Sequence, residues 1–121
     1  MRDLTRGGLA TAMVEIARSA HLRFELEEAA IPVLEEVSGA CEILGLDPLY
    51  VANEGRMAVF VDPRDADTAL SVMKQSFPGL QPARIGRVSG PASPGRVTVK
   101  NTLGTTRGID MLAGDPLPRI C

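Results

Sequence analysis

Apolar residues recur at helical spacing near the start of the chain and predict a helix over residues 9–20. Its apolar positions are Leu9, Met13, Ile16 and Ala17. Gly7 and Gly8 precede this stretch, and Thr5 is a candidate N-cap because a hydroxyl oxygen accepts hydrogen bonds from the free backbone N–H groups of a first turn. We therefore expect a largely buried amphipathic helix with a glycine pair at its N-terminal end.

The same spacing predicts two further helices, each bounded by residues typical of helix ends. One spans residues 33–44, with a proline before it and Gly45 at its end. The other spans residues 62–77, with Asp62 as its cap and Pro63 in its first turn. The expected inner stripe of this last helix consists of Ala66, Leu70 and Met73.

Alternating or continuous apolar runs, bounded by turn residues, predict the strands. They span residues 21–27, 56–61, 84–89, 96–100 and 105–109. The run RMAVFV at 56–61 is so apolar that we expect a central strand. The connections GPASPG and NTLG are both typical of hairpin turns. The passage LDPLYVANEG, just before RMAVFV, is rich in turn residues.

This order of elements predicts an α+β fold, a mostly antiparallel sheet with helices packed on one face. Residues 1–109 are expected to form that domain. Residues 110–121 are expected to form a mobile tail that contains two prolines and ends in Cys121. The chain enters its first helix with almost no lead-in, so we expect it to be part of a larger protein.

The composition indicates a single globular domain and argues against several classes of binding protein. A chain of 121 residues that is 45% hydrophobic but only 3% aromatic is one domain in size, with an aliphatic core. Its net charge of −2 and the absence of a basic stripe argue against binding to nucleic acid or a membrane surface. No apolar run approaches the roughly 18 residues of a membrane span, and the absence of a charged-then-apolar start leads us to expect no secretion.

The two cysteines, Cys41 and Cys121, together with the single histidine, His21, are too few for a four-ligand zinc site. We therefore expect no metal site within this chain, reduced thiols and a cytoplasmic location. Cys41 lies among apolar residues of the predicted second helix and is expected in the core. His21 lies at a helix–strand junction, where a surface or capping role is expected.

The stretch DLTRGGL is the first candidate for chemistry. Glycines at a helix start let backbone N–H groups approach an anion, and the helix dipole favours negative charge there. Thr5 and Arg6 add a hydroxyl and a guanidinium group that suit phosphate oxygens. The alternative is a plain glycine-rich cap, in which Asp3 or Thr5 satisfies backbone donors. The pattern matches neither the P-loop motif GxxxxGK(S/T) nor the dinucleotide-binding motif GxGxxG.

Glu54 and Cys121 are the other two candidates. Glu54 is expected in a turn before an apolar strand, where a partly buried carboxylate acts as a general base and an exposed one is only a turn acid. The terminal carboxylate beside Cys121 should raise the pKa of its thiol, so this residue is not a ready nucleophile. Cys121 is therefore either a thiol without a role in the chemistry or one that accepts a group only when it is placed in a site.

Three segments together resemble the hydrogenase maturation protein HypE family, within the aminoimidazole ribonucleotide synthetase-like ATP-binding superfamily. They are RDLTRGGLATA at the start, IPVLEEVSGACEILGLDPLYVANEG in the middle and MLAGDPLPRIC at the end. The terminal PRIC is the most specific element, whereas the pattern DxTRGG is shared across the superfamily. Leu4 departs from the family, which usually has proline there, and we expect only a slight change of the turn. The match corresponds to the C-terminal half of such a protein.

The resemblance implies an ATP-dependent carbamoyl dehydratase of the lyase type, in which the isolated domain is inactive. A carbamoyltransferase, HypF, would load the thiol of Cys121, and the full-length protein would use ATP with magnesium to dehydrate the S-carboxamide to a thiocyanate. The product would supply cyanide to nickel–iron hydrogenase through the HypC–HypD iron-carrier complex. The implied base is Glu54, with Asn53 orienting the amide. The residues implied near the nucleotide phosphates are Asp3, Thr5, Arg6, Gly7 and Gly8.

The resemblance also implies a homodimer formed through an N-terminal domain that this chain lacks. Two other readings stay open. The chain is alternatively a non-catalytic module that docks a partner and presents a thiol, or a domain of a related small-molecule kinase or synthetase. Deletion of residues 119–121 would abolish activity under the dehydratase reading and leave it unchanged under the kinase reading.

Overall fold

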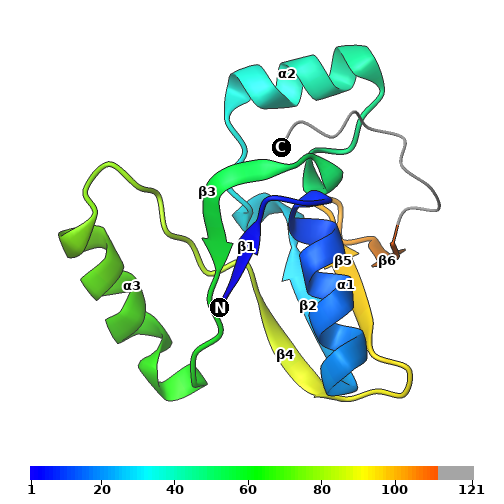
Figure 1. The fold of residues 1–121 in the computed structure, drawn as a ribbon, viewed down its shortest axis with the longest axis vertical. Coiled ribbons are helices and arrows are strands. Elements are labelled where there is room, and N and C mark those ends of the chain that lie inside the picture. The colour runs from blue at the N-terminus through cyan, green and yellow to red at the C-terminus, as the bar shows by residue number, and fades with distance from the viewer. Residues whose placement is uncertain (112–121) are drawn as a thin grey trace.

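The computed structural model describes residues 1–111, so the expected tail from residue 112 onward, including Cys121, lies outside the described residues. The helices are α1 (Gly8–Ala20), α2 (Glu35–Leu44) and α3 (Ala66–Ser76). The strands are β1 (Arg2–Leu4), β2 (Leu22–Glu27), β3 (Asn53–Ala58), β4 (Gly86–Pro91), β5 (Arg96–Lys100) and β6 (Thr106–Ile109). Figure 1 shows their arrangement.

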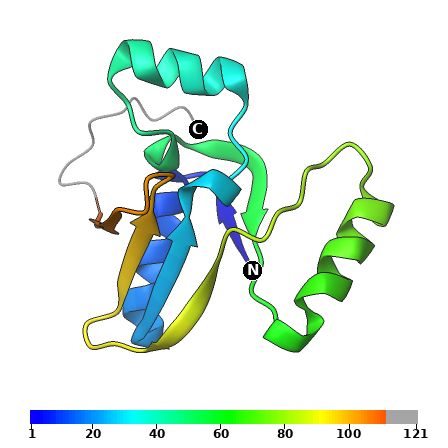
Figure 2. The same cartoon turned by 180° about the vertical axis from the view of Figure 1, so that it is seen from behind.

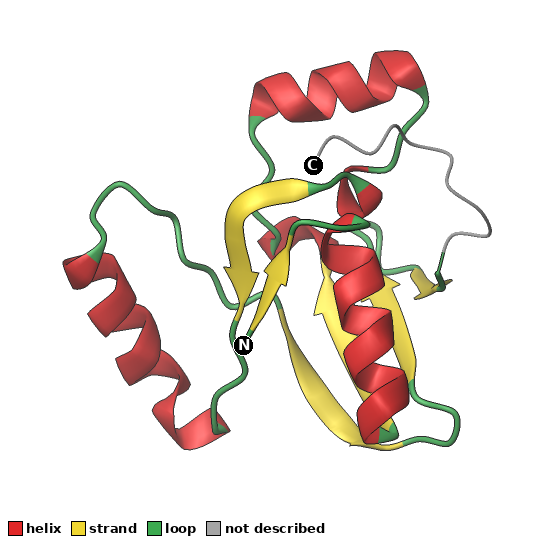
Figure 3. Ribbon diagram, in the orientation of Figure 1, coloured by secondary structure: helices red, strands yellow, loops and turns green. Residues whose placement is uncertain are grey.

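The strands form two separate sheets (Figure 3). The larger has the order β4-β2-β5-β6, in which β2 pairs with β5 in parallel and the other two pairings are antiparallel. The smaller consists of β1 and β3, paired antiparallel. The predicted α+β class with a mostly antiparallel sheet is therefore confirmed.

The core lies between α1 and one face of the larger sheet (Figures 1 and 2). Val14 of α1 and Val97 and Val99 of β5 are almost completely buried, as the alternation of the strands and the apolar stripe of the helix predict. Phe24 and Leu26 of β2 face the same core. The sequence predicted this helix most clearly, because its apolar residues recur at helical spacing over its full length.

The other two helices lie outside this layer. The main neighbour of α2 is a short 3-10 helix, Pro48–Tyr50, and that of α3 is its own N-terminal turn, Pro63–Asp65. Both views place α3 apart from the larger sheet, beyond β3 (Figures 1 and 2). Of the residues on the expected inner stripe of α3, Ala66 is buried and the others are half-buried. Of the described helices, α1 is therefore the one that packs on the larger sheet.

The run 56–61 is not a central strand, which corrects the prediction. The strand begins earlier, at Asn53, and pairs on one side with β1, an element that the sequence pattern did not indicate. That strand ends at Ala58, and the apolar side chains of the run 56–61 remain 41–59% exposed at Met57, Val59, Phe60 and Val61. An apolar run predicts burial, but the partner that buries it is decided by tertiary contacts.

The connection GPASPG is not a hairpin, because β4 and β5 lie on opposite sides of β2. Its Gly95 packs against the backbone of α1, where an added Cβ would come within 1.7 Å of the Ala17 carbonyl oxygen. The connection NTLG is a hairpin, as predicted. There the Asn101 side chain accepts from the backbone N–H groups of Leu103 and Thr105 at 3.0 and 2.9 Å.

Candidate functional site

The pairing of β1 with β3 brings the glycine-containing motif beside Asn53 and Glu54. Leu4 lies opposite Asn53, whereas Asp3 lies opposite Met57. The register therefore shifts between Asp3 and Leu4, and the three residues 54–56 bulge out of the ladder without a partner on β1. Bulges of this kind re-aim side chains and are common next to functional sites. Glu54 is thus in a strand irregularity, not in the turn that we predicted.

The position of β1 is set by two contacts with the rest of the domain. Leu4 is 8% exposed and belongs to the core. The Arg2 guanidinium forms an ion pair with the Glu15 carboxylate on α1. Leu4 is therefore the buried end of a strand and not the turn residue that we expected from the sequence.

The glycine pair at the start of α1 is explained by packing. Gly7 is the N-cap residue with φ +65°, and Gly8 follows with φ +64°. A Cβ on Gly8 would lie 2.5 Å from the carbonyl oxygens of both Leu49 and Val51. Thr5, the predicted cap, lies in the preceding turn, and α1 has no side-chain cap. These glycines are therefore required by the fold whether or not a phosphate binds.

The candidate polar residues lie on an open surface. Asp3, Arg6, Asn53 and Glu54 are exposed, and Thr5 is half-buried. Within residues 1–111, none of these side chains forms an ion pair or a hydrogen bond. The partial burial that a carboxylate base needs is therefore not supplied to Glu54 by this part of the chain. Residues outside this part of the chain would have to cover Glu54.

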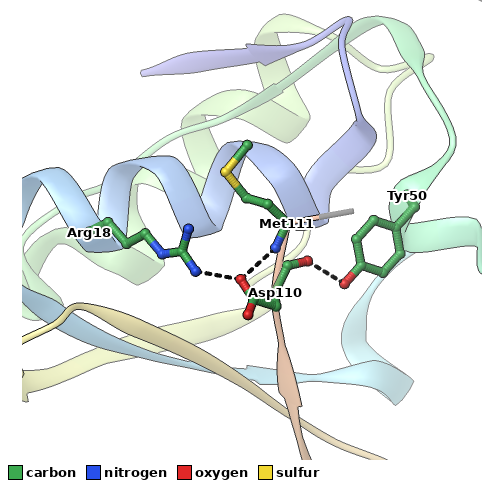
Figure 4. Close-up of polar contacts among 4 residues, drawn as sticks. All are labelled: Arg18, Tyr50, Asp110 and Met111. Atoms are coloured by element: carbon green, nitrogen blue, oxygen red, sulfur yellow. Dashed lines mark hydrogen bonds and ion pairs between the residues drawn. The ribbon is translucent and has the colours of Figure 1, made fainter. Parts of the chain in front are cut away.

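Asp110 joins three parts of the molecule where the described chain ends (Figure 4). The Tyr50 hydroxyl donates to the Asp110 carbonyl oxygen at 2.6 Å, and the Arg18 guanidinium donates to the Asp110 carboxylate. The same carboxylate accepts from the Met111 backbone N–H at 2.7 Å. The last described residues therefore lie beside Tyr50, which is three residues before Asn53 in the sequence.

A second polar contact supports Tyr50. Arg107 of β6 donates to the Asp47 carboxylate at 2.9 Å, and the other oxygen of that carboxylate accepts from the Leu49 N–H at 2.9 Å. Sequence reasoning missed these residues because the partners are 60 positions apart, beyond any local periodicity. The one available signal was that Tyr50 is the single tyrosine of the chain, placed in a segment rich in turn residues.

Two hollows lie on the larger sheet, and neither is lined by the candidate residues. One, of about 390 Å³, is lined in part by Arg18, Gly95, Ile109 and Asp110. The other, of about 540 Å³, has a charged lining that includes Glu25 and Arg87. The hydrogen bond from Arg87 at 2.9 Å lowers the pKa of the half-buried Glu25 carboxyl below its ordinary value. None of the residues predicted for the candidate site lines this polar face.

The remaining candidates lie where the sequence predicted. Cys41 is buried with a free thiol, and His21 is an exposed C-cap residue with φ 54°. Among the residues that the structure describes, no group of three or more His, Cys, Asp or Glu side chains is placed to hold a metal ion. None of the helices in this part of the chain is long and apolar enough to cross a membrane.

Comparisons with known proteins extend this picture. Residues 1–98 match the family model described as AIR synthase related protein, C-terminal domain. The carbamoyl dehydratase HypE of Rhodobacter capsulatus is 49% identical over 120 residues, which are 99% of this chain and 35% of that protein. This chain therefore spans about a third of the length of such relatives, not the half that the sequence suggested.

Solved structures agree with the sequence comparison. A structure of the hydrogenase maturation protein HypE in complex with ATP is similar with a TM-score of 0.89 at 42% identity, over 99% of this chain and 37% of the other. A chain of the HypE–HypF complex gives a TM-score of 0.83 at 37% identity, over 92% of this chain and 35% of the other. The fold described above is therefore shared with experimentally determined HypE structures.

Proposed function

Because the chain belongs to the AIR synthase related protein C-terminal domain family, we propose that it is this domain of a HypE-type, ATP-dependent carbamoyl dehydratase. Its similarity to carbamoyl dehydratase HypE along 99% of its length is the observation that carries the proposal. The solved complex of HypE with ATP supports the use of that nucleotide. The complex with HypF supports a carbamoyltransferase partner.

In the proposed reaction, Cys121 carries a carbamoyl group as an S-carboxamide. The carboxamide oxygen attacks the γ-phosphorus of ATP, the bond to ADP breaks, and an O-phosphorylated intermediate forms. The carbon–oxygen bond then breaks as phosphate leaves, and the nitrogen gives up its two protons as the carbon–nitrogen bond becomes triple. The product is a thiocyanate on the same sulfur, which supplies cyanide for nickel–iron hydrogenase through HypC and HypD.

The residues of the β1–β3 bulge would act at the proton-transfer step. Glu54 would take a proton from nitrogen, and Asn53 would orient the amide through its side-chain oxygen and nitrogen. Both lie in one irregular stretch of strand opposite the end of β1. Because Glu54 is exposed here, the proposal requires the remainder of the full-length protein to cover it. For the same reason we expect the isolated domain to be inactive.

The turn between β1 and α1 would face the phosphates. The Thr5 hydroxyl and the Arg6 guanidinium are donors that suit phosphate oxygens, and the start of α1 adds a favourable dipole. Asp3, Gly7 and Gly8 would shape this turn. The described residues offer donors for phosphate, but among them no group of carboxylates is placed to hold magnesium. The nucleotide and its metal would therefore be held mainly by the rest of the protein, which would also form the homodimer in the cytoplasm.

Mass spectrometry of the full-length protein tests this function. The protein is incubated with ATP, carbamoyl phosphate and the transferase, and the C-terminal peptide is analysed over time. The expected result is a carbamoyl adduct on Cys121 that then loses the mass of water in an ATP-dependent step. An adduct that never loses water would favour a thiol-presenting docking module. No adduct on Cys121, with activity retained after deletion of Arg119–Cys121, would favour a related kinase or synthetase.

A further inference from the structure

The larger sheet has one face that packs against α1 and an opposite face that is open. Phe24 and Leu26 of β2, and Val97 and Val99 of β5, point into the core under α1. Because side chains alternate along a strand, the residues between these positions point to the opposite face. Figure 2 shows that face with no helix of residues 1–111 in front of it. The described part of the chain therefore leaves it accessible.

This open face is rich in basic side chains. The strand register and the lining of the hollow of about 540 Å³ bring five basic and two acidic residues together there. They are Arg23, Arg84, Arg87, Arg96 and Lys100, with Glu25 and Glu27. We call this set the basic sheet face. Five positive charges against two negative ones leave a net charge of +3, although the whole chain has a net charge of −2. The charge of the chain is therefore unevenly distributed.

Most charges of the basic sheet face have no opposite charge beside them. Within residues 1–111, the one ion pair on this face joins Arg87 to Glu25 at 2.9 Å. Arg23 of β2 lies opposite Arg96 of β5, and like charges at facing positions of neighbouring strands repel one another. Both of these arginines and Lys100 are exposed. An anionic group placed on this face would relieve the repulsion.

The remaining side chains of the face indicate which anionic partner it fits. The chain has three phenylalanines and one tyrosine, and none of them lines the hollow. Sheets that bind single-stranded nucleic acid stack its bases on aromatic side chains, which are missing here. Glu25 and Glu27 would also repel a continuous phosphate backbone, whereas a protein segment can place a neutral or basic residue opposite them. The face therefore fits an acidic protein segment better than a nucleic acid.

We propose that the basic sheet face is a docking surface for an acidic segment of a partner protein. This does not depend on the function proposed above. Exposed ion pairs are individually weak and are screened by salt, so the contact acts mainly on the rate and orientation of encounter. The sequence showed no basic stripe because these five basic residues are spread over positions 23–100 and come together only in the sheet.

The test measures binding of a fluorescein-labelled peptide of alternating glutamate and glycine to the full-length protein. Fluorescence anisotropy gives the Kd at low and at high NaCl concentration, and labelled oligothymidylate is the second probe. The wild type is compared with the face variant, Arg84→Gln with Lys100→Gln, and with Glu27→Gln. The matched control is Arg64→Gln with Lys74→Gln, which changes the net charge equally but lies on α3 and the turn before it. All five substituted residues are exposed, so each variant should fold.

At low salt, we expect the face variant to bind the acidic peptide about two- to thirtyfold more weakly, the range for loss of two exposed ion pairs. Glu27→Gln should bind it more tightly, because the substitution removes a charge that repels the peptide. The control variant should match the wild type. High salt should reduce all of these differences by screening. A folding defect would not produce opposite effects from two sets of substitutions on the same face.

Three results would overturn the proposal. Equal weakening in the face variant and the control variant would mean that only the net charge of the protein matters. No binding of the acidic peptide to the wild type at low salt would mean that the face does not dock acidic segments. Tighter binding of oligothymidylate than of the peptide, lost in the face variant, would assign the face to nucleic acid instead.

Discussion

Leu4 lies directly opposite Asn53 in the pairing of β1 with β3, although the preceding pair joins Asp3 to Met57. The shift leaves residues 54–56 without a partner on β1, and Asn53, next to Glu54, pairs with the residue that precedes the turn into α1. Two segments that the sequence singled out for separate reasons are therefore neighbours in space. This supports one shared site more strongly than either motif did alone.

Replacement of Glu54 by Gln should abolish loss of water from carbamoylated Cys121 in the full-length protein, with carbamoylation by the transferase intact. The amide keeps the size of the side chain but cannot take a proton at neutral pH. A base in proton transfer typically contributes about 10²- to 10⁴-fold in rate. Single-turnover mass spectrometry measures both steps. Glu42→Gln, an exposed acid on α2, is the control, and equal rates in the two variants would remove Glu54 from the mechanism.

Gly8→Ala should destabilise the chain by at least about 2 kcal/mol, because the added Cβ meets the Leu49 and Val51 carbonyl oxygens at 2.5 Å in a left-handed backbone conformation. Gly39→Ala is the matched control. Gly39 lies within α2 with nothing within 4 Å of an added Cβ, so alanine there should stabilise by about 0.5–1 kcal/mol. Urea unfolding monitored by circular dichroism measures both changes. Tolerance of Gly8→Ala would contradict the close approach of the Pro48–Tyr50 turn.

Arg87→Met should raise the pKa of the Glu25 carboxyl toward its ordinary value, because the hydrogen bond from Arg87 is the main cause of its depression. A depressed carboxyl pKa stabilises the folded state at pH values above the unfolded pKa. That stabilisation is lost as pH falls through the lowered pKa, below the ordinary glutamate value of about 4.3. The stability difference between wild type and variant should therefore be present at pH 7 and vanish in acid.

Carboxyl titration by NMR and urea unfolding at several pH values check that expectation. Arg56→Met is the control, because the described part of the chain places Arg56 in no ion pair. A stability difference for Arg87→Met that persists at the lowest pH would show that the arginine acts through packing of its stem and not through Glu25.

Val99→Ala should destabilise the chain by about 2 kcal/mol, because Val99 of β5 is completely buried in the core between α1 and the larger sheet. Val72 on α3 is 54% exposed, and Val72→Ala should be neutral or slightly stabilising because alanine is the better helix former. Thermal unfolding of the two variants gives the comparison. A large loss for Val72→Ala would mean that α3 packs against the domain more closely than its exposure indicates.

Several elements followed from local pattern. The periodicity of residues 9–20 predicted α1, and β5 was predicted with its observed bounds because Val97 and Val99 alternate with polar residues. The end of α2 at Gly45, with φ +69°, followed from the need for a left-handed residue at a helix C-terminus. These features depend on a few adjacent residues, so the sequence carries them directly.

The sequence by itself thus determined the α+β class, the main helix, the aliphatic core and the residues that resemble a carbamoyl dehydratase. The tertiary structure alone decided that GPASPG crosses over β2, that residues 54–56 bulge opposite Leu4, and that Asp110 meets Tyr50 and Arg18. Each of these depends on backbone or side-chain contacts between distant positions. Local propensity does not specify such contacts, because the free energy that selects them comes from burying the whole core at once.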